Sequence, residues 1–151
     1  MTIVPAVDQI AGLLEQFAAR GGYVRGVVVL SADGLPKASH GLDTASRDQL
    51  AATATGMWSL AGSAASVFDG SETVRQVAAE LDHTTLFVAA AGSGSRLAVV
   101  ADRQARPALV SHEITMLIKK LQSHLATAAR PMEAVPPVVP PVVPSDPAAM
   151  S

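Results

Sequence analysis

The four histidines are the side chains of this chain best suited to acid–base or metal chemistry, because the sequence has no cysteine. They belong to different predicted elements rather than to one cluster, and they are His40, His83, His112 and His124. His112-Glu113 starts the spacing of a zinc-protease helix, but the position of the second histidine holds Met116. We therefore expect no metal site, no cofactor and no thiolate nucleophile.

Serine-containing segments offer little more chemistry. Gly92-Ser-Gly-Ser-Arg96 lacks the lysine of a phosphate-binding loop and leads into a predicted strand, so it is interpreted as a hairpin turn. Ser111 and His112 are neighbours on a predicted helix and do not face one another. The sequence has no Gly-x-Ser-x-Gly elbow of a serine hydrolase. Without clustered ionisable groups we expect a protein that is not an enzyme, and small-molecule chemistry in a cleft is the least favoured alternative.

Charge and composition divide the chain into two parts. The formal net charge is −2 and the basic residues are dispersed, so there is no electrostatic case for binding nucleic acid or an anionic membrane. Residues 1–130 hold all eleven Lys and Arg, whereas residues 131–151 hold seven of the ten prolines. We expect a domain over 1–130 and an extended, polyproline-like or disordered tail over 131–151. The tail is either a passive extension or a docking peptide for a groove lined with aromatic side chains.

The segment from Gln49 to Phe68 runs for twenty residues without a charged side chain. Its Ala and Leu content favours a helix over a strand. Such a helix has no charged face to present to water, so we expect it to be covered on more than one side. Its serines, threonines and glycines make a membrane span too costly. The first twenty residues lack the basic start and apolar core of a signal peptide. We expect a soluble, cytoplasmic protein without membrane insertion.

Periodicity and turn signals predict the order helix, two strands, helix, three strands, helix. Because a hairpin and a meander must share one sheet, the most apolar strands should be central and adjacent, with strands 35–40 and 72–81 at the two edges. The last helix should bury one apolar stripe, made of Val110, Ile114, Leu117, Leu121, Leu125 and Ala128. The expected elements are a helix from Pro5 to Gly21-Gly22, strands 26–31 and 35–40, a long helix capped by Asp43 or Thr44, strands 72–81, 84–91 and 95–102, and a helix from Pro107.

The uncharged helix is followed directly by the long edge strand 72–81. An unpaired edge with apolar content is available for pairing with another chain, so the two consecutive elements predict self-association. We expect the helix to pack on its own sheet through Leu50, Met57, Ala61, Ala64 and Phe68. The expected dimer or partner interface consists of small residues of the helix, its tryptophan and one strand valine: Ala52, Thr55, Gly56, Trp58, Ser59, Gly62, Ser63 and Val77. Any of these could instead pack on its own sheet, and for Trp58 both alternatives stay open.

Taken in order, these motifs resemble the roadblock/dynein light chain domain family. Residues 26–44 resemble its first hairpin, in which a strand ends in Ser-x-Asp-Gly-Leu, and residues 49–62 resemble its small-residue middle helix. Short segments within 80–99 match its meander, and 113–117 match its final helix. The resemblance covers about residues 7–128 and is strongest to stand-alone bacterial members common in actinobacteria. It implies an α/β (α+β) fold: a five-stranded antiparallel sheet with one long middle helix on one face and the N- and C-terminal helices on the other.

The resemblance also implies a homodimer joined through the middle helix and the following strand. Bacterial relatives act on small Ras-like GTPases as activating or scaffolding subunits, often encoded beside a sensor-kinase-like protein. Activation in such relatives positions the GTPase's own switch residues, without an inserted arginine. Our hypothesis is therefore a non-catalytic homodimeric regulator of a small Ras-like GTPase. The alternative is a signalling or polarity-complex scaffold that binds a sensor-kinase-like partner without altering GTP turnover.

Overall fold

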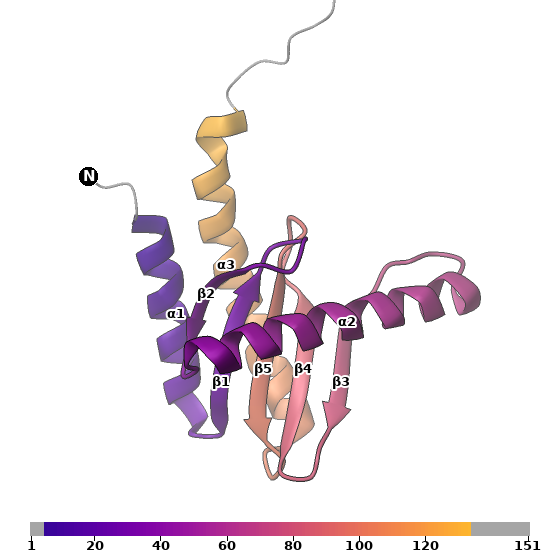
Figure 1. Ribbon diagram of the computed structural model, residues 1–151. Coiled ribbons are helices and arrows are strands. Elements are labelled where there is room, and N and C mark those ends of the chain that lie inside the picture. The colour runs from indigo at the N-terminus through magenta and orange to yellow at the C-terminus, as the bar shows by residue number, and fades with distance from the viewer. Residues whose placement is uncertain (1–4, 134–151) are drawn as a thin grey trace, which may run out of the picture.

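The computed structural model describes residues 5–133, which form three helices and five strands (Figure 1). The strands form one antiparallel sheet in the order β2-β1-β5-β4-β3. The predicted element order and both predicted edge strands are therefore confirmed, and the predicted central pair, β1 and β5, is adjacent. In chain order the elements are α1 (Pro5–Gly21), β1 (Val24–Leu30), β2 (Pro36–His40), α2 (Thr44–Phe68), β3 (Gln76–Glu80), β4 (Thr84–Ala90), β5 (Arg96–Asp102) and α3 (Pro107–Glu133).

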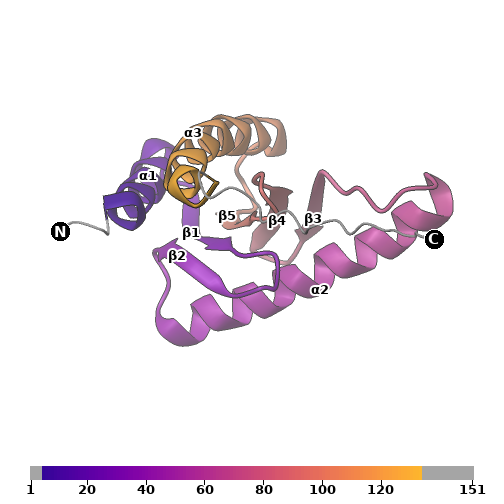
Figure 2. The ribbon, with the colours of Figure 1, turned by 90° about the horizontal axis from the view of Figure 1, so that it is seen from above.

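The valines of β1 supply two separate hydrophobic cores, one on each face of the sheet. Val27 and Val29 pack with α1 and α3, whereas Val28 packs with α2. Successive side chains of a strand point to opposite faces, so a continuous apolar run must be covered on both sides. Figure 2 shows this arrangement, with α1 and α3 on one face of the sheet and α2 on the other. The helices lie where the family resemblance placed them.

Helix α3 confirms its predicted stripe where its side chains are described. The four residues from Val110 to Leu121 on that stripe are buried, while Leu125 and Ala128 lie outside the described side chains. The helix continues to Glu133, so the expectation that helix cannot form from Pro131 onward is wrong for three residues. A proline removes one hydrogen bond and crowds the preceding turn, and here only the last turn of the helix carries that cost. The rest of the predicted tail, 134–151, lies outside the described residues.

Helix α2 crosses all five strands and then extends past the edge strand β3 (Figures 1 and 2). Its 25 residues span about 37 Å, whereas the outer strands of a five-stranded sheet lie only about 19 Å apart. The first half of the helix buries Leu50, Ala51 and Ala54 on the sheet. The prediction that Ala64 and Phe68 pack on their own sheet is wrong, because at those positions the helix has already passed the sheet and both residues are exposed.

Strand β3 is shorter than expected, because it starts at Gln76 rather than at Glu72. After α2 ends at Phe68, the chain must return to the edge of the sheet before it can pair. Gly62 faces this returning segment: a Cβ on it would lie 3.8 Å from the carbonyl oxygen of Glu72. Residues 69–75 are therefore needed to return from the end of the helix to the sheet, and they cannot belong to the strand.

Candidate partner-binding surface

Asp43 fixes the start of α2, as one of the two predicted caps. Its Oδ1 accepts a hydrogen bond from the backbone N–H of Ser46 at 2.7 Å, and its backbone is extended. An unpaired N–H of the first helical turn is satisfied in this way. The same hydrogen bonds lower the pKa of the Asp43 carboxyl, since they favour its charged form. The helix is thus anchored at the end that lies over the sheet.

Four of the predicted interface residues form one exposed strip along α2: Ala52, Gly56, Ser59 and Ser63. Their spacing of four, three and four residues places them on one side of a helix. A Cβ built on Gly56 would meet nothing within 4 Å, so the strip is open at its centre. Because its side chains are small, a partner can approach the helix backbone closely along this strip.

Thr55 has a role within its own chain that the sequence did not reveal. Its hydroxyl donates a hydrogen bond to the carbonyl oxygen of Ala51 at 2.8 Å. The tip of the β1–β2 hairpin rests against it, because a Cβ on Gly34 would lie 2.7 Å from that hydroxyl oxygen. Gly34 has φ +86°, a conformation that only glycine adopts readily, and its N–H donates to the Ser31 carbonyl at 3.0 Å. The turn between β1 and β2 thus contacts α2 at Thr55.

Trp58 lies at a shallow depression beside the strip, which we call the notch. The tryptophan is partly buried against the α2 core, so its own sheet covers part of the ring. The guanidinium of Arg96, at the start of β5, lies 5.3 Å from the ring centroid, within the range of a cation–π interaction. The notch has a volume of about 390 Å³, and five of its lining residues were predicted; the full lining is Thr55, Trp58, Ser59, Gly62, Ser63, Glu72 and Arg96.

Two residues of the notch, Glu72 and Arg96, were missed from the sequence. Arg96 is thirty-eight positions from Trp58, and the pairing of Arg96 with Leu30 in the sheet brings it under the helix. Glu72 belongs to the segment that returns along α2. No local periodicity connects such positions, so only the tertiary arrangement could identify them.

The far end of α2 carries exposed apolar side chains, and one of them, Phe68, was predicted to lie in the core. Leu60, Val67 and Phe68 are 74%, 76% and 84% exposed, and we call residues 60–68 the overhang. Large apolar side chains gathered on one exposed segment typically mark an interaction site. The comparison of helix length with sheet width could have revealed them from the sequence.

The edge strand β3 lies beside the overhang and has no neighbouring strand on its outer side within the described part of the chain. The carbonyl of Arg75 accepts from the N–H of Ala90, and the N–H of Leu81 donates to the carbonyl of Thr84. Hydrogen-bonded positions alternate along an antiparallel pair, so every second residue of β3 turns its N–H and C=O outward, namely Gln76, Ala78 and Glu80. Val77, the predicted interface residue of this strand, is paired with Val88 of the α2 core and is half-buried.

A second depression of the described domain is lined by ionisable side chains. It contains the ion pair Arg25–Asp102, and Nε2 of His83 lies 3.3 Å from a carboxylate oxygen of Asp82. Over the described residues, no group of three or more His, Asp or Glu side chains could hold a metal ion. Within the same residues, none of the helices has the length and apolar character that crossing a bilayer would require.

Comparisons with known proteins agree with this architecture. The family model of the Roadblock/LC7 domain matches residues 10–101. A Roadblock/LC7 domain from Streptomyces avermitilis is 44% identical, with a TM-score of 0.72 over 76% of this chain and 96% of that one. A second domain from the same organism is 33% identical, with a TM-score of 0.62 over 74% and 97%.

More distant similarity extends to MglB of Myxococcus xanthus, which is 17% identical, with a TM-score of 0.73 over 85% of this chain and 96% of that one, and so shares the fold. No curated protein matches the chain. The match of the family model over more than half of the chain, together with the two Streptomyces structures, shows that the chain belongs to the Roadblock/LC7 domain family.

Proposed function

We propose that this protein is a non-catalytic homodimer in the cytoplasm that binds a small Ras-like GTPase and alters its nucleotide cycle. The observation that carries the proposal is the overhang of α2, exposed at Leu60, Val67 and Phe68, directly beside the unpaired edge of β3. Two adhesive features side by side favour one large interface over two separate small ones. Membership of the Roadblock/LC7 family supports the same proposal, since the bacterial relatives implied by the resemblance act on such GTPases.

A second copy of the chain fits the overhang and the edge together. Antiparallel pairing of two β3 strands around a two-fold axis would use the outward-facing backbone groups of Gln76, Ala78 and Glu80. The register that uses all three residues pairs Ala78 of one copy with Ala78 of the other. It pairs Gln76 of each copy with Glu80 of the other. Each α2, which already extends past its own β3, would then lie over the sheet of the other copy. Phe68 is eighteen residues, or five helical turns, after the sheet-facing Leu50 and so lies on the same side of α2. The second copy would therefore cover Phe68 in this arrangement.

The GTPase is assigned to the outer strip of α2 and the notch beside it. In the described chain this strip is uncharged and made of small side chains, which allows close approach of a partner backbone. The notch adds polar groups at one side, since Arg96 stacks on Trp58 while Glu72 lies on the same rim. Such a surface can hold a switch segment in place without supplying a reacting group.

The decisive experiment compares GTP hydrolysis by the Ras-like GTPase encoded nearest to this gene, with and without the protein, under single-turnover conditions. Binding is measured in parallel by calorimetry. We expect binding and a changed hydrolysis rate, both reduced by Gly56→Trp on the strip and unchanged by the control Leu35→Ser on the exposed hairpin turn. Binding with an unchanged rate would support the scaffold alternative, and absence of binding would contradict the assignment to a GTPase.

The dimer is tested separately by light scattering after size-exclusion chromatography. A mass of twice 15.4 kDa is expected at micromolar concentration, and the mass of a single chain would contradict the homodimer. Because this measurement needs no GTPase, it separates failure of the dimer from failure of the partner assignment.

A further inference from the structure

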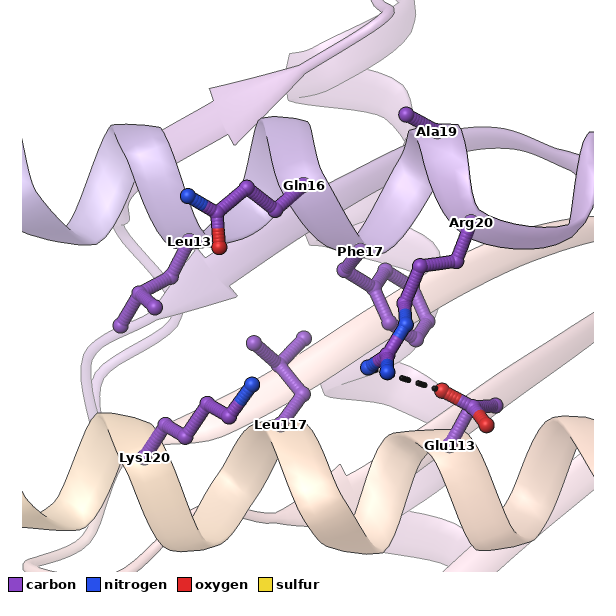
Figure 3. A pocket seen from close by; sticks show the side chains of 8 residues that line it. All are labelled: Leu13, Gln16, Phe17, Ala19, Arg20, Glu113, Leu117 and Lys120. Atoms are coloured by element: carbon purple, nitrogen blue, oxygen red, sulfur yellow. Dashed lines mark ion pairs between the residues drawn. The ribbon is translucent and has the colours of Figure 1, made fainter.

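A groove between α1 and α3, on the face opposite α2, is not used by the proposed function. Figure 3 shows side chains of the two helices pointing toward one another across it. Its volume is about 450 Å³, which falls in the range of sites that hold small ligands or short peptide segments. The lining residues are Leu13, Gln16, Phe17, Ala19 and Arg20 of α1, and Glu113, Leu117 and Lys120 of α3.

The floor of this groove is apolar and its rim is charged. Phe17 and Leu117 are buried at the floor, and Leu13 is partly buried beside them. At one end Arg20 pairs with Glu113 at 3.5 Å, while Lys120 stands exposed at the other end. Two cations against one carboxylate give the rim a net positive charge. The rim therefore suits an apolar segment that carries a negative charge.

Exposed apolar side chains continue beyond the groove on α3. Leu109 and Met116 are 45% and 38% exposed. Leu109 is four residues before Glu113, and Met116 is four residues before Lys120, so both lie on the same side of the helix as the groove. Apolar surface of this kind next to an apolar groove indicates that a further segment covers this side.

We propose that the groove is the docking site of this chain's own C-terminal segment, residues 134–151. That segment consists largely of Pro and Val, with the repeated sequence Pro-Pro-Val-Val at 136–139 and 140–143. It has one acidic residue, Asp146, and no basic residue. Closely spaced prolines favour an extended, polyproline-like backbone, and such a segment loses little conformational entropy when it docks in a groove.

The reach of the segment selects which repeat enters the groove. Leu117 lies sixteen residues before the end of α3 at Glu133, a distance of about 24 Å along the helix. An extended polyproline-like chain covers that distance in roughly eight residues at about 3.1 Å each. Reversing direction takes a turn of about four residues. Counted from Glu133, these twelve residues bring Ser145 level with Leu117. Val142 and Val143 of the second repeat therefore reach the end of the groove where Leu13 and Lys120 lie, and Asp146 reaches the end where Arg20 lies (Figure 3).

Attachment to the same chain makes weak binding sufficient. A short flexible connection gives an effective concentration on the order of 1 mM. A segment that binds as a free peptide with a Kd of about 1 mM would then be bound about half of the time when it is tethered to the chain. Two valines on an apolar floor and one ion pair at the rim are a contact set of that modest size.

The test uses the full-length chain and its lack of cysteine. Ser145→Cys creates a single attachment site for a nitroxide spin label, and amide signals are compared between the oxidised and reduced label. We expect the amides of Leu13, Gln16 and Arg20 on α1 to lose most of their intensity, while those of Ala52 and Ser59 on α2 keep theirs. Equal losses on both helices, or no loss on α1, would overturn the proposal.

Two matched double variants test the predicted register without touching the folded domain. Val142→Asp with Val143→Asp should restore the α1 intensities, whereas Val138→Asp with Val139→Asp in the first repeat should leave the loss unchanged. The same effect from both variants would contradict the register. Docking onto a second copy is detected in a mixture of two kinds of chain. One carries the spin label and no isotope label, and the other is isotope-labelled and has no cysteine. A loss on α1 in that mixture would replace the same-chain occupant by the segment of a partner subunit.

Discussion

The two halves of α2 are both rich in alanine but have opposite surroundings. From Thr44 to Met57 the helix lies on the sheet and buries Leu50, Ala51 and Ala54. Its C-terminal end extends past β3 (Figure 1), and the large apolar side chains of residues 60–68 are exposed there. The difference is set by geometry, because the helix is about twice as long as the sheet is wide. The first half therefore stabilises the fold of one chain, and the second half is available for association.

The largest expected effect is a difference in unfolding free energy between matched leucine substitutions in the two halves of α2. Leu50→Ala removes a side chain that is 6% exposed, and loss of such a buried leucine costs about 2–5 kcal/mol of unfolding free energy. Leu60→Ala, the matched change on the overhang, should alter it by less than about 0.5 kcal/mol in dilute solution. Urea unfolding followed by circular dichroism at low protein concentration measures both. Equal destabilisation by the two variants would show that the halves do not differ.

Association should respond in the opposite way. Phe68→Ser removes the most exposed aromatic side chain of the overhang and, as a central apolar anchor, should weaken the dimer by about 2 kcal/mol, or roughly 30-fold in Kd. Leu35→Ser removes an exposed apolar side chain of the hairpin turn and should leave the Kd unchanged. Sedimentation equilibrium gives both constants. A dimer unaffected by Phe68→Ser would remove the overhang from the interface.

The same comparison shows how far the sequence could predict this protein. The apolar run of β1 and the turn residues around it predicted the sheet and its central strands, because those signals are local. The cap at Asp43 was predicted for the same reason. The assignment of Phe68 to the core was wrong, because it followed from the apolar side of the helix alone. The width of a five-stranded sheet, compared with the length of the helix, would have placed Phe68 beyond the sheet.

The candidate site was predicted in part for a related reason. Small, uncharged residues of α2 predicted the strip, since their spacing along one helix is readable from the chain. The contacts of Thr55 with the Gly34 turn and of Trp58 with Arg96 join positions far apart in sequence. Such contacts depend on strand order and register, which no helix periodicity specifies. The notch therefore needed the structure, whereas the strip did not.

A smaller effect on stability tests whether Gly56, at the centre of the strip, is uncovered in the folded chain. Gly56→Ala adds a Cβ that meets nothing within 4 Å in one chain, so helix propensity should raise the unfolding free energy by about 1 kcal/mol. The same methyl group should weaken the proposed binding of a GTPase, because it would hold the partner backbone away from the helix. Gly12→Ala in α1 is the control for helix propensity, because its Cβ would also meet nothing within 4 Å and it lies outside the strip and the notch. Destabilisation by Gly56→Ala would show that this position is already covered in the folded chain.

The smallest effect concerns the anchored end of α2. Hydrogen bonds from Ser46 lower the pKa of Asp43 in the folded chain, so the folded state holds its proton less tightly than the unfolded state does. The stabilisation from this cap is therefore complete above the ordinary aspartate pKa of about 3.9 and is lost as the pH falls through the lower folded value. Asp43→Asn keeps a capping side chain that does not titrate, so its unfolding free energy should fall less steeply in this acid window. The pKa of Asp33 is also lowered, by its hydrogen bond with Ser31. Because Asp33 is present in both proteins, its contribution cancels when the two unfolding free energies are subtracted. Identical acid profiles of wild type and Asp43→Asn, measured by urea unfolding, would mean that the helix start is held by its packing on the sheet alone.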